Sequence, residues 1–147
     1  MPKYSNQNYI KRIIDANLNR TKEGLRVCEE ITRFALNNRA LSLEFKRVRH
    51  KIDGLFVSLH LKLNLLKERN SIKDVGKTIS LYELKRKNCQ DIFFANIQRV
   101  KESIRVLEEF SKLINRNIAI EFKKIRYRIY EIEKRAAQRI SASCHYR

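Results

Sequence analysis

Proline and glycine are scarce in this sequence, in which 147 residues include one proline, at position 2, and three glycines. Few positions can therefore break a helix or form a tight turn, and no glycine-rich dinucleotide-binding loop exists. Gly76-Lys77-Thr78 imitates the end of a P-loop, but Ser71 occupies the place of the earlier glycine and no strand pattern precedes the motif. Leucine, isoleucine, lysine, arginine and glutamate are abundant instead. This composition predicts an all-α fold.

Cysteine is also sparse, and the three cysteines, Cys28, Cys89 and Cys144, lie far apart in the sequence. Neither they nor the three histidines have a spacing typical of zinc ligands, so we expect free thiols in a reducing compartment. No apolar run approaches the roughly 18 residues of a membrane span, and the first residues lack the apolar segment of a signal peptide. We therefore expect a cytoplasmic protein with no membrane partner.

Acidic residues are few relative to basic ones, and the formal net charge is +17. A charge of this size permits binding to nucleic acid without demonstrating it, because net charge governs association rather than fold or site. The basic residues are spread along every predicted helix, and few aromatic residues are expected on an outer face to stack on bases. A basic RNA-binding helical bundle stays open as a second alternative function.

The sequence contains an internal repeat, in which the helical pattern of residues 15–31 recurs at residues 95–109. The first copy contains Ala16, Asn17, Arg20, Lys22, Glu23, Arg26, Val27, Glu29 and Glu30, and the second contains Ala95, Asn96, Arg99, Lys101, Glu102, Arg105, Val106, Glu108 and Glu109. A further block follows each copy, and Glu44-Phe45-Lys46, Arg49 and Ile52 recur as Glu121-Phe122-Lys123, Arg126 and Ile129. The repeat predicts a bundle of two tandem antiparallel helical hairpins.

The repeat and the turn signals divide a single helical domain, residues 1–147, into two hairpins. Hairpin one covers about residues 6–67 and hairpin two about residues 80–139, with a linker at 68–79 and a frayed tail at 140–147. Asn37-Asn38 marks the turn of hairpin one, because asparagine tolerates the left-handed conformation. Ser80-Leu81-Tyr82-Glu83 has the pattern of a capping box and predicts that the third long helix begins there.

Polar residues recur in the repeat as well as apolar ones. At about 100° per residue, Arg20 falls on the same stripe of the first helix as Asn17, Cys28, Ile31 and Phe34. A guanidinium on a core-facing stripe needs an anion, because an unpaired buried charge is very costly. The anion is either a carboxylate of the protein, such as Glu23 or one from the other hairpin, or an anionic ligand in a cavity. Both alternatives are open from the sequence.

Other candidates lie outside this stripe. Arg49 and Arg126 occupy equivalent places at the edge of the apolar seam on the second helix of each hairpin. Asp74 in the linker either caps its own loop through an Asx turn or holds a metal ion or a substrate hydroxyl. Cys28 is expected to be a packed thiol rather than a nucleophile, since nothing suggests a base near it.

The run Asp-Ala-Asn-Leu-Asn-Arg-x-x-Glu-Gly-Leu-Arg-Val-x-Glu-Glu at residues 15–30 resembles a helical domain found alone or fused ahead of thiamine phosphate synthase in bacteria. Further similarity comes from Asp74-Val75-Gly76, from the second copy at residues 95–109 and from Arg126-Tyr127-Arg128 with Tyr130-Glu131. The resemblance covers about residues 12–134. It implies an unconventional hydroxymethylpyrimidine phosphate kinase, which uses ATP and Mg²⁺ to make the pyrimidine diphosphate that the synthase joins to the thiazole.

For a phosphotransferase between two polyanions, the helical phases and the repeat predict the site. The predicted phosphate clamps are Arg20, Arg49, Arg99 and Arg126. Asn17 and Asn96 are expected to bind the aminopyrimidine or a ribose, and Asp74 with Glu23 or Glu102 to hold Mg²⁺. The first alternative function is a non-catalytic helical module that binds a thiamine precursor or docks on thiamine phosphate synthase, and homo-oligomerisation is a further possibility.

Overall fold

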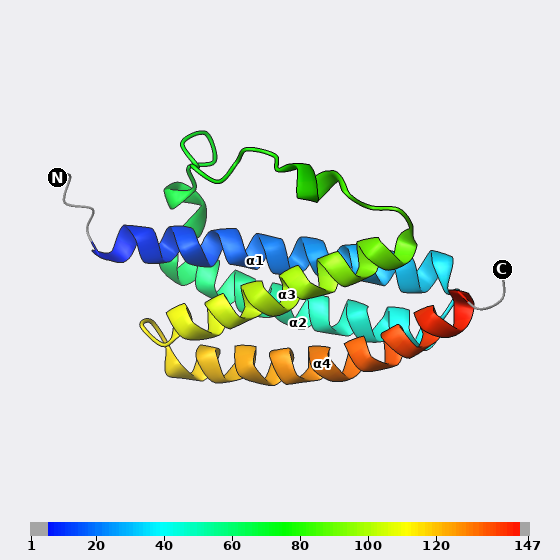
Figure 1. The fold of residues 1–147 in the computed structure, drawn as a ribbon. Helices are drawn as coiled ribbons and strands as arrows, with labels where there is room; N and C mark the ends of the chain where they lie inside the picture. The colour runs from blue at the N-terminus through cyan, green and yellow to red at the C-terminus, as the bar shows by residue number, and fades with distance from the viewer. Residues whose placement is uncertain (1–5, 145–147) are drawn as a thin grey trace.

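The structure is a computed structural model that describes the backbone of residues 6–144 and the side chains of residues 8–59 and 64–143. Four long helices dominate it: α1 (Asn6–Glu30), α2 (Arg39–Leu63), α3 (Cys89–Ser111) and α4 (Arg116–Cys144). Short helical turns connect them, namely the π-helix η1 (Ile31–Ala35) and the 3₁₀ turns η2 (Leu65–Glu68) and η3 (Leu81–Leu84). Residues 6–144 contain no strand, which confirms the all-α prediction (Figure 1).

The helices pack as two neighbouring pairs. The most extensive contact joins α1 to α3, while α2 packs on α1 and α4 packs on α3 (Figure 1). The contact between α1 and α3 therefore lies at the centre of the molecule and positions the residues of those two helices.

Among residues 6–144, no helix is both long and apolar enough to cross a membrane.

A continuous apolar core holds the helices together. The rings of Phe45 and Phe93 meet edge to face with their centroids 6.1 Å apart, and both are fully buried. Burying a side chain of this size stabilises the fold by roughly 1.5–3 kcal/mol. Other large side chains that are fully buried include Ile14, Leu18, Leu25, Ile52, Leu59, Leu65, Ile97, Ile104, Leu107 and Phe122.

The core-facing stripe of α1 differs from the predicted one. It is centred near Ile14, Leu18 and Leu25, roughly 60–100° around the helix from Asn17. Arg20 lies on the other flank of Asn17 and is exposed, so the prediction of a core-facing guanidinium is wrong. Phe34 is 68% exposed, because it lies in η1, where the π-helical turn alters the rotation per residue.

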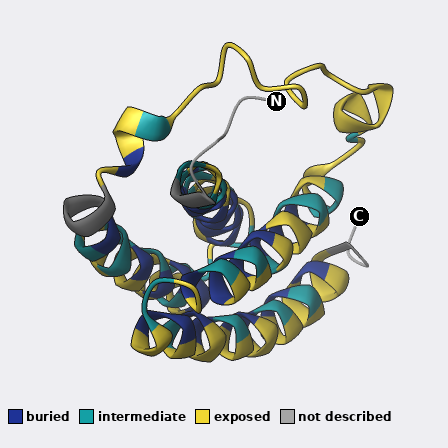
Figure 2. Ribbon diagram, turned by 90° about the vertical axis from the view of Figure 1, so that its left-hand side faces the viewer, coloured by how far each residue is buried: buried dark blue, intermediate teal, exposed yellow. Residues whose placement is uncertain are grey.

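The irregular segment between α2 and α3 extends further along the chain than the predicted linker of residues 68–79. Ser80 makes no side-chain cap, and the turn that follows it ends at Leu84, so the capping-box prediction is wrong. Asn88 caps α3 instead, and its Oδ1 accepts a hydrogen bond from the backbone N–H of Asp91 at 2.9 Å. The linker from Arg69 to Asn88 runs across the molecule with its residues largely exposed (Figure 2).

The other helix boundaries are set by local side-chain interactions. Asn37 adopts a left-handed conformation with φ of 49°, which confirms the predicted turn. Asn38 caps α2 by accepting a hydrogen bond from the backbone N–H of Leu41 at 3.0 Å. Whereas a frayed tail is predicted from about residue 140, α4 continues to Cys144 because Ile140 extends its buried stripe. Residues 145–147 of that tail lie outside the described residues.

Small residues allow α1 and α3 to approach closely. A Cβ atom at Gly24 would lie 2.6 Å from Cγ2 of Val100 and 3.1 Å from the carbonyl oxygen of Asn96. Beside it, the buried hydroxyls of Thr21 and Ser103 share a hydrogen bond of 2.6 Å. The closeness of this crossing brings polar residues of the two helices to one shared groove.

Candidate functional site

A groove of about 460 Å³ lies beside the crossing of α1 and α3. It contains six of the nine residues that the sequence predicts for the site, three from each helix. Its lining is formed by Asn17, Arg20, Glu23 and Gly24 of α1, Asn96, Arg99, Glu102, Ser103 and Val106 of α3, and Glu83 of η3. The two copies of the sequence pattern thus contribute equivalent polar residues to one place.

The two asparagines of the groove are held in the same way. The side-chain amide of Asn17 donates to the carbonyl oxygen of Ile13, and that of Asn96 donates to the carbonyl oxygen of Ile92, each at 2.8 Å. These bonds fix the orientation of both side chains on their helices. The amide oxygen of each asparagine is left as an acceptor for a ligand that donates hydrogen bonds.

The two arginines of the groove are free of protein partners. Arg20 and Arg99 are exposed, and neither forms an ion pair or a hydrogen bond within the described part of the chain. Glu23 and Glu102 line the same groove, but neither pairs with an arginine there, and Glu102 accepts from Gln98 Nε2 at 3.1 Å instead. Pairing of Arg20 with Glu23 or with a carboxylate of the other hairpin, one of the two alternatives left open by the sequence, is thus not observed among the described residues. Both guanidinium groups can bind an anion.

Asp74 lies in a neighbouring hollow of about 540 Å³ that shares Asn17, Arg20 and Glu23 with the groove. Its Oδ1 accepts a hydrogen bond from the backbone N–H of Gly76 at 2.8 Å. This is the loop cap that the sequence offered as one of two interpretations. The exposed carboxylate retains further acceptor capacity toward the hollow.

A functional candidate that the sequence prediction missed is Asp15, which anchors the start of the linker. Arg69 donates to its two carboxylate oxygens at 2.7 and 2.8 Å, and Asp15 is only 3% exposed. This bidentate contact is the main cause that raises the pKa of Arg69. Asp15 opens the repeated motif, but Phe94 occupies its place in the second copy, so the repeat gave no signal for it.

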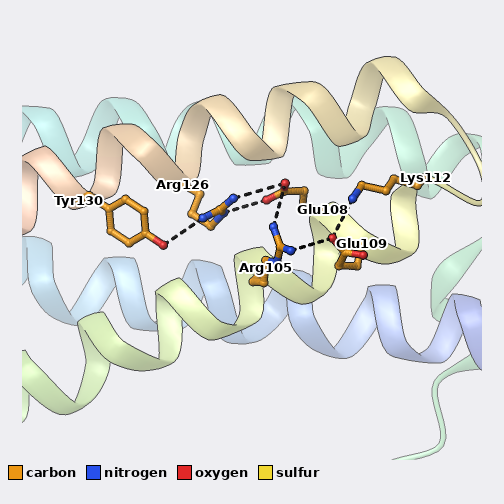
Figure 3. Close-up of polar contacts among 6 residues, drawn as sticks. All are labelled: Arg105, Glu108, Glu109, Lys112, Arg126 and Tyr130. Carbon is orange, nitrogen blue, oxygen red and sulfur yellow. Dashed lines mark hydrogen bonds and ion pairs between the residues drawn. The ribbon is translucent and has the colours of Figure 1, made fainter.

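The remaining two predicted clamps, Arg49 and Arg126, lie outside the groove. Nε of Arg49 donates to Glu29 at 2.8 Å. Figure 3 shows the equivalent pair of hairpin two, in which Nε of Arg126 donates to Glu108 at 2.8 Å. Both glutamate side chains are only 4% exposed. These hydrogen bonds are the largest cause raising the pKa of each arginine. The sequence prediction missed both glutamates, although their recurrence in the repeat was a signal.

Aromatic side chains surround the second of these pairs. The hydroxyl of Tyr130 accepts a hydrogen bond from Arg126 at 3.0 Å (Figure 3). The same guanidinium lies 5.2 Å from the ring centroid of Tyr127. Both tyrosines are exposed. The expectation of few outward aromatic residues is therefore wrong at this face of α4.

The described residues contain no group of three or more histidine, cysteine or acidic side chains that could hold a metal ion by themselves. Glu23 and Asp74 do line one hollow, which also contains the free guanidinium of Arg20. Mg²⁺ is commonly held by one or two carboxylates together with substrate phosphates. The side chains present therefore fit Mg²⁺ that arrives with a phosphorylated ligand.

These features define a class: a helical bundle whose two halves share an arginine- and asparagine-lined groove. Residues 12–135 match the model of the ThiD2 family, and the chain belongs to that family. The match confirms the resemblance seen in the sequence.

The chain is similar to proteins called thiamine-phosphate synthase. The chain is 41% identical over 128 residues to the protein of Nostoc punctiforme, covering 86% of this chain and 35% of that protein. It is 41% identical over 125 residues to the protein of Synechocystis sp., covering 84% of this chain and 35% of that protein. The chain thus spans about a third of the length of these relatives. No solved structure matches the chain significantly.

Proposed function

We propose that this chain is a phosphotransferase of thiamine biosynthesis that converts hydroxymethylpyrimidine phosphate to its diphosphate. The observation that carries the proposal is the pair of arginines, Arg20 and Arg99, that lie in one groove without a partner in the described part of the chain. Two exposed guanidinium groups in a groove are suited to phosphate groups because each presents a planar fork of donors. The relatives' names support the pathway, and the resemblance in sequence supports the kinase step.

The chemistry requires positioning and positive charge rather than a covalent intermediate. A phosphate oxygen of the pyrimidine attacks the γ-phosphorus of ATP, a new P–O bond forms, and the bond to the β-phosphate breaks to release ADP. Arg20 and Arg99 bind the phosphate groups and stabilise the charge on the transferred phosphoryl group. The amide oxygens of Asn17 and Asn96 accept hydrogen bonds from the amino group of the pyrimidine or from a ribose hydroxyl.

The metal is proposed to bind at Asp74 and Glu23, which line the same hollow. When bound there, Mg²⁺ would neutralise part of the phosphate charge. Glu102 of α3 also lines the groove and is the alternative carboxylate proposed for the metal. Arg49 and Arg126 are left out of the reaction, because both are occupied by buried glutamates.

A non-catalytic module is the second candidate function. It is favoured by the exposed apolar side chains of the linker, such as Val75 and Leu81. A module of this kind would bind the pyrimidine in the groove without transferring a phosphoryl group. The same groove thus supports both candidates, and only turnover separates them.

The decisive experiment is a turnover assay with the purified chain, hydroxymethylpyrimidine phosphate, ATP and Mg²⁺. Phosphorus NMR should show a new diphosphate, and separately purified thiamine phosphate synthase should then consume it. The Arg99→Gln variant, which keeps the shape of the groove but removes one charge, should lose most of this turnover. Binding of the pyrimidine without any diphosphate would establish the module instead. A short RNA serves as a third ligand, and preferential binding of RNA would overturn both candidates.

A further inference from the structure

We propose a second anion-binding site at the turn of hairpin one, which takes the polyphosphate group of a small molecule. A hollow of about 580 Å³ lies between the end of α1 and the start of α2. Its lining consists of Arg26, Glu29, Arg33, Asn37, Arg39, Ser42, Leu43, Lys46 and Arg49. This site is separate from the proposed reaction, since Gly24 of the groove and Arg26 of the hollow lie about 200° apart around α1.

The charges of this hollow are unbalanced. Five cationic side chains line it together with a single carboxylate, that of Glu29. That carboxylate already binds Arg49 at 2.8 Å and approaches Arg26 at 3.6 Å. The three other cations of the lining, Arg33, Arg39 and Lys46, have no acidic partner among the described residues. An anion from outside the chain would therefore complete the site.

In the equivalent region of hairpin two, the corresponding cation has a carboxylate partner. There Lys112, the counterpart of Arg33, pairs with Glu109 at 2.7 Å (Figure 3). In hairpin one the equivalent carboxylate, Glu30, binds only Arg26 among the described side chains, at 3.2 Å, and forms no ion pair with Arg33. The same two sequence positions thus form an ion pair in one hairpin and not in the other.

The local backbone accounts for this difference. The π-helix η1 begins at Ile31, directly after Glu30, and contains Arg33. Its wider turn changes the angle between these two positions, whereas α3 stays α-helical to Ser111 and its C-cap residue Lys112 keeps the right-handed helical conformation. Single π-helical turns interrupt α-helices frequently at functional sites. The irregular turn coincides with the hollow whose cations lack partners.

The chemistry of the lining selects a phosphate-rich ligand. Guanidinium groups bind phosphate through paired hydrogen bonds, and Lys46 adds a point charge. A volume of about 580 Å³ lies within the usual range of small-molecule sites and exceeds the need of a single phosphate. Leu43 is the one large apolar side chain of the lining, so recognition rests on the phosphate groups rather than on a ring.

Inorganic tripolyphosphate is the probe, titrated by calorimetry at physiological ionic strength. The starting protein is the Arg20→Gln/Arg99→Gln variant, which removes binding in the groove from the signal. We expect one saturable site in this protein. Adding Arg33→Gln and Lys46→Gln should weaken binding at least about tenfold, because two charge-assisted contacts are lost.

The matched control adds Lys112→Gln and Lys123→Gln instead, at the equivalent positions of hairpin two. It removes the same number of charges, so it should weaken binding less than about threefold, which is the effect of overall charge alone. Equal weakening by both changes, or no binding in the starting protein, would overturn the proposal. Circular dichroism checks that each variant is folded. Failure here is distinguishable from failure of the proposed function, which the turnover assay measures through the groove.

Discussion

Two sets of arginines recur in the two halves of the chain, and their surroundings are opposite. Arg49 and Arg126, on α2 and α4, bind glutamates that are almost fully buried. Arg20 and Arg99, on α1 and α3, are exposed and have no partner among the side chains of residues 8–59 and 64–143. Recurrence of a charged residue therefore has two separate causes in this protein. The paired arginines serve folding, whereas the unpaired ones are available to a ligand.

The largest loss of stability should come from replacing a paired arginine. Arg49→Met or Arg126→Met removes the main partner of a buried carboxylate and leaves it only the more exposed Arg26 or Arg105. The free energy of unfolding should fall by about 3 kcal/mol, near the lower end for buried pairs, because each replaced arginine is partly exposed and the second arginine remains. Urea unfolding measures this loss. A variant as stable as wild type would show that these pairs are dispensable.

The unpaired arginines should give the reverse pattern. Arg20→Met or Arg99→Met should change the free energy of unfolding by less than about 0.5 kcal/mol, as is usual for exposed positions. The loss should appear when hydroxymethylpyrimidine phosphate binds, where a missing charge-assisted contact costs roughly 1.5–3 kcal/mol. Calorimetry with the two variants measures both quantities. Unchanged affinity together with a large loss of stability would assign these arginines to the scaffold.

The groove that holds the unpaired arginines depends on the close crossing at Gly24. Gly24→Ala places a methyl group against Val100 and the backbone of Asn96 and should destabilise the protein by about 1–2 kcal/mol, after the better helix propensity of alanine is included. Gly54 is the matched control, since nothing lies within 4 Å of its added Cβ. Gly54→Ala should stabilise by about 0.5–1 kcal/mol. Thermal melting that moves both variants in the same direction would contradict the close approach.

The smallest effect on stability is expected at Asp74. Asp74→Asn retains the turn to Gly76, because asparagine makes the same bond, so the free energy of unfolding should change by less than about 0.5 kcal/mol. Turnover should nevertheless fall at least about tenfold if the carboxylate holds Mg²⁺ as proposed. The melting curve and the turnover assay on one preparation separate these effects. Full activity in the variant would remove Asp74 from the site.

The sequence predicted the groove better than it predicted the environment of each residue. The repeat pointed to Asn17, Arg20, Asn96 and Arg99 because the same polar residues recur at the same spacing, and the structure places all four together. The predicted apolar face of α1 is centred on Asn17 and is wrong, because Asn17 lies at the edge of the core. Helical phase gives direction around one helix but not the position of its neighbours.

Other features depend on contacts that no local pattern encodes. The pairing of Arg49 with Glu29 joins residues on two different helices, so their recurrence alone did not reveal that they touch. The contact between Asp15 and Arg69 spans 54 positions and has no second copy. The start of α3 was misplaced because Ser80 and Glu83 have the residue types of a capping box without the long helix that should follow. Tertiary contacts decided each of these cases.

The long, exposed linker has a consequence for how the molecule is held together. Because the Thr21–Ser103 contact and the close approach at Gly24 join α1 directly to α3, the two hairpins adhere through their own surfaces. The linker contributes mainly a high local concentration of one half around the other. A protease that cuts between Ser71 and Lys85 should therefore leave a nicked but assembled protein. The two halves, produced as separate chains, form a natural pair for fragment complementation, in which recovery of the shared groove reports their reassociation.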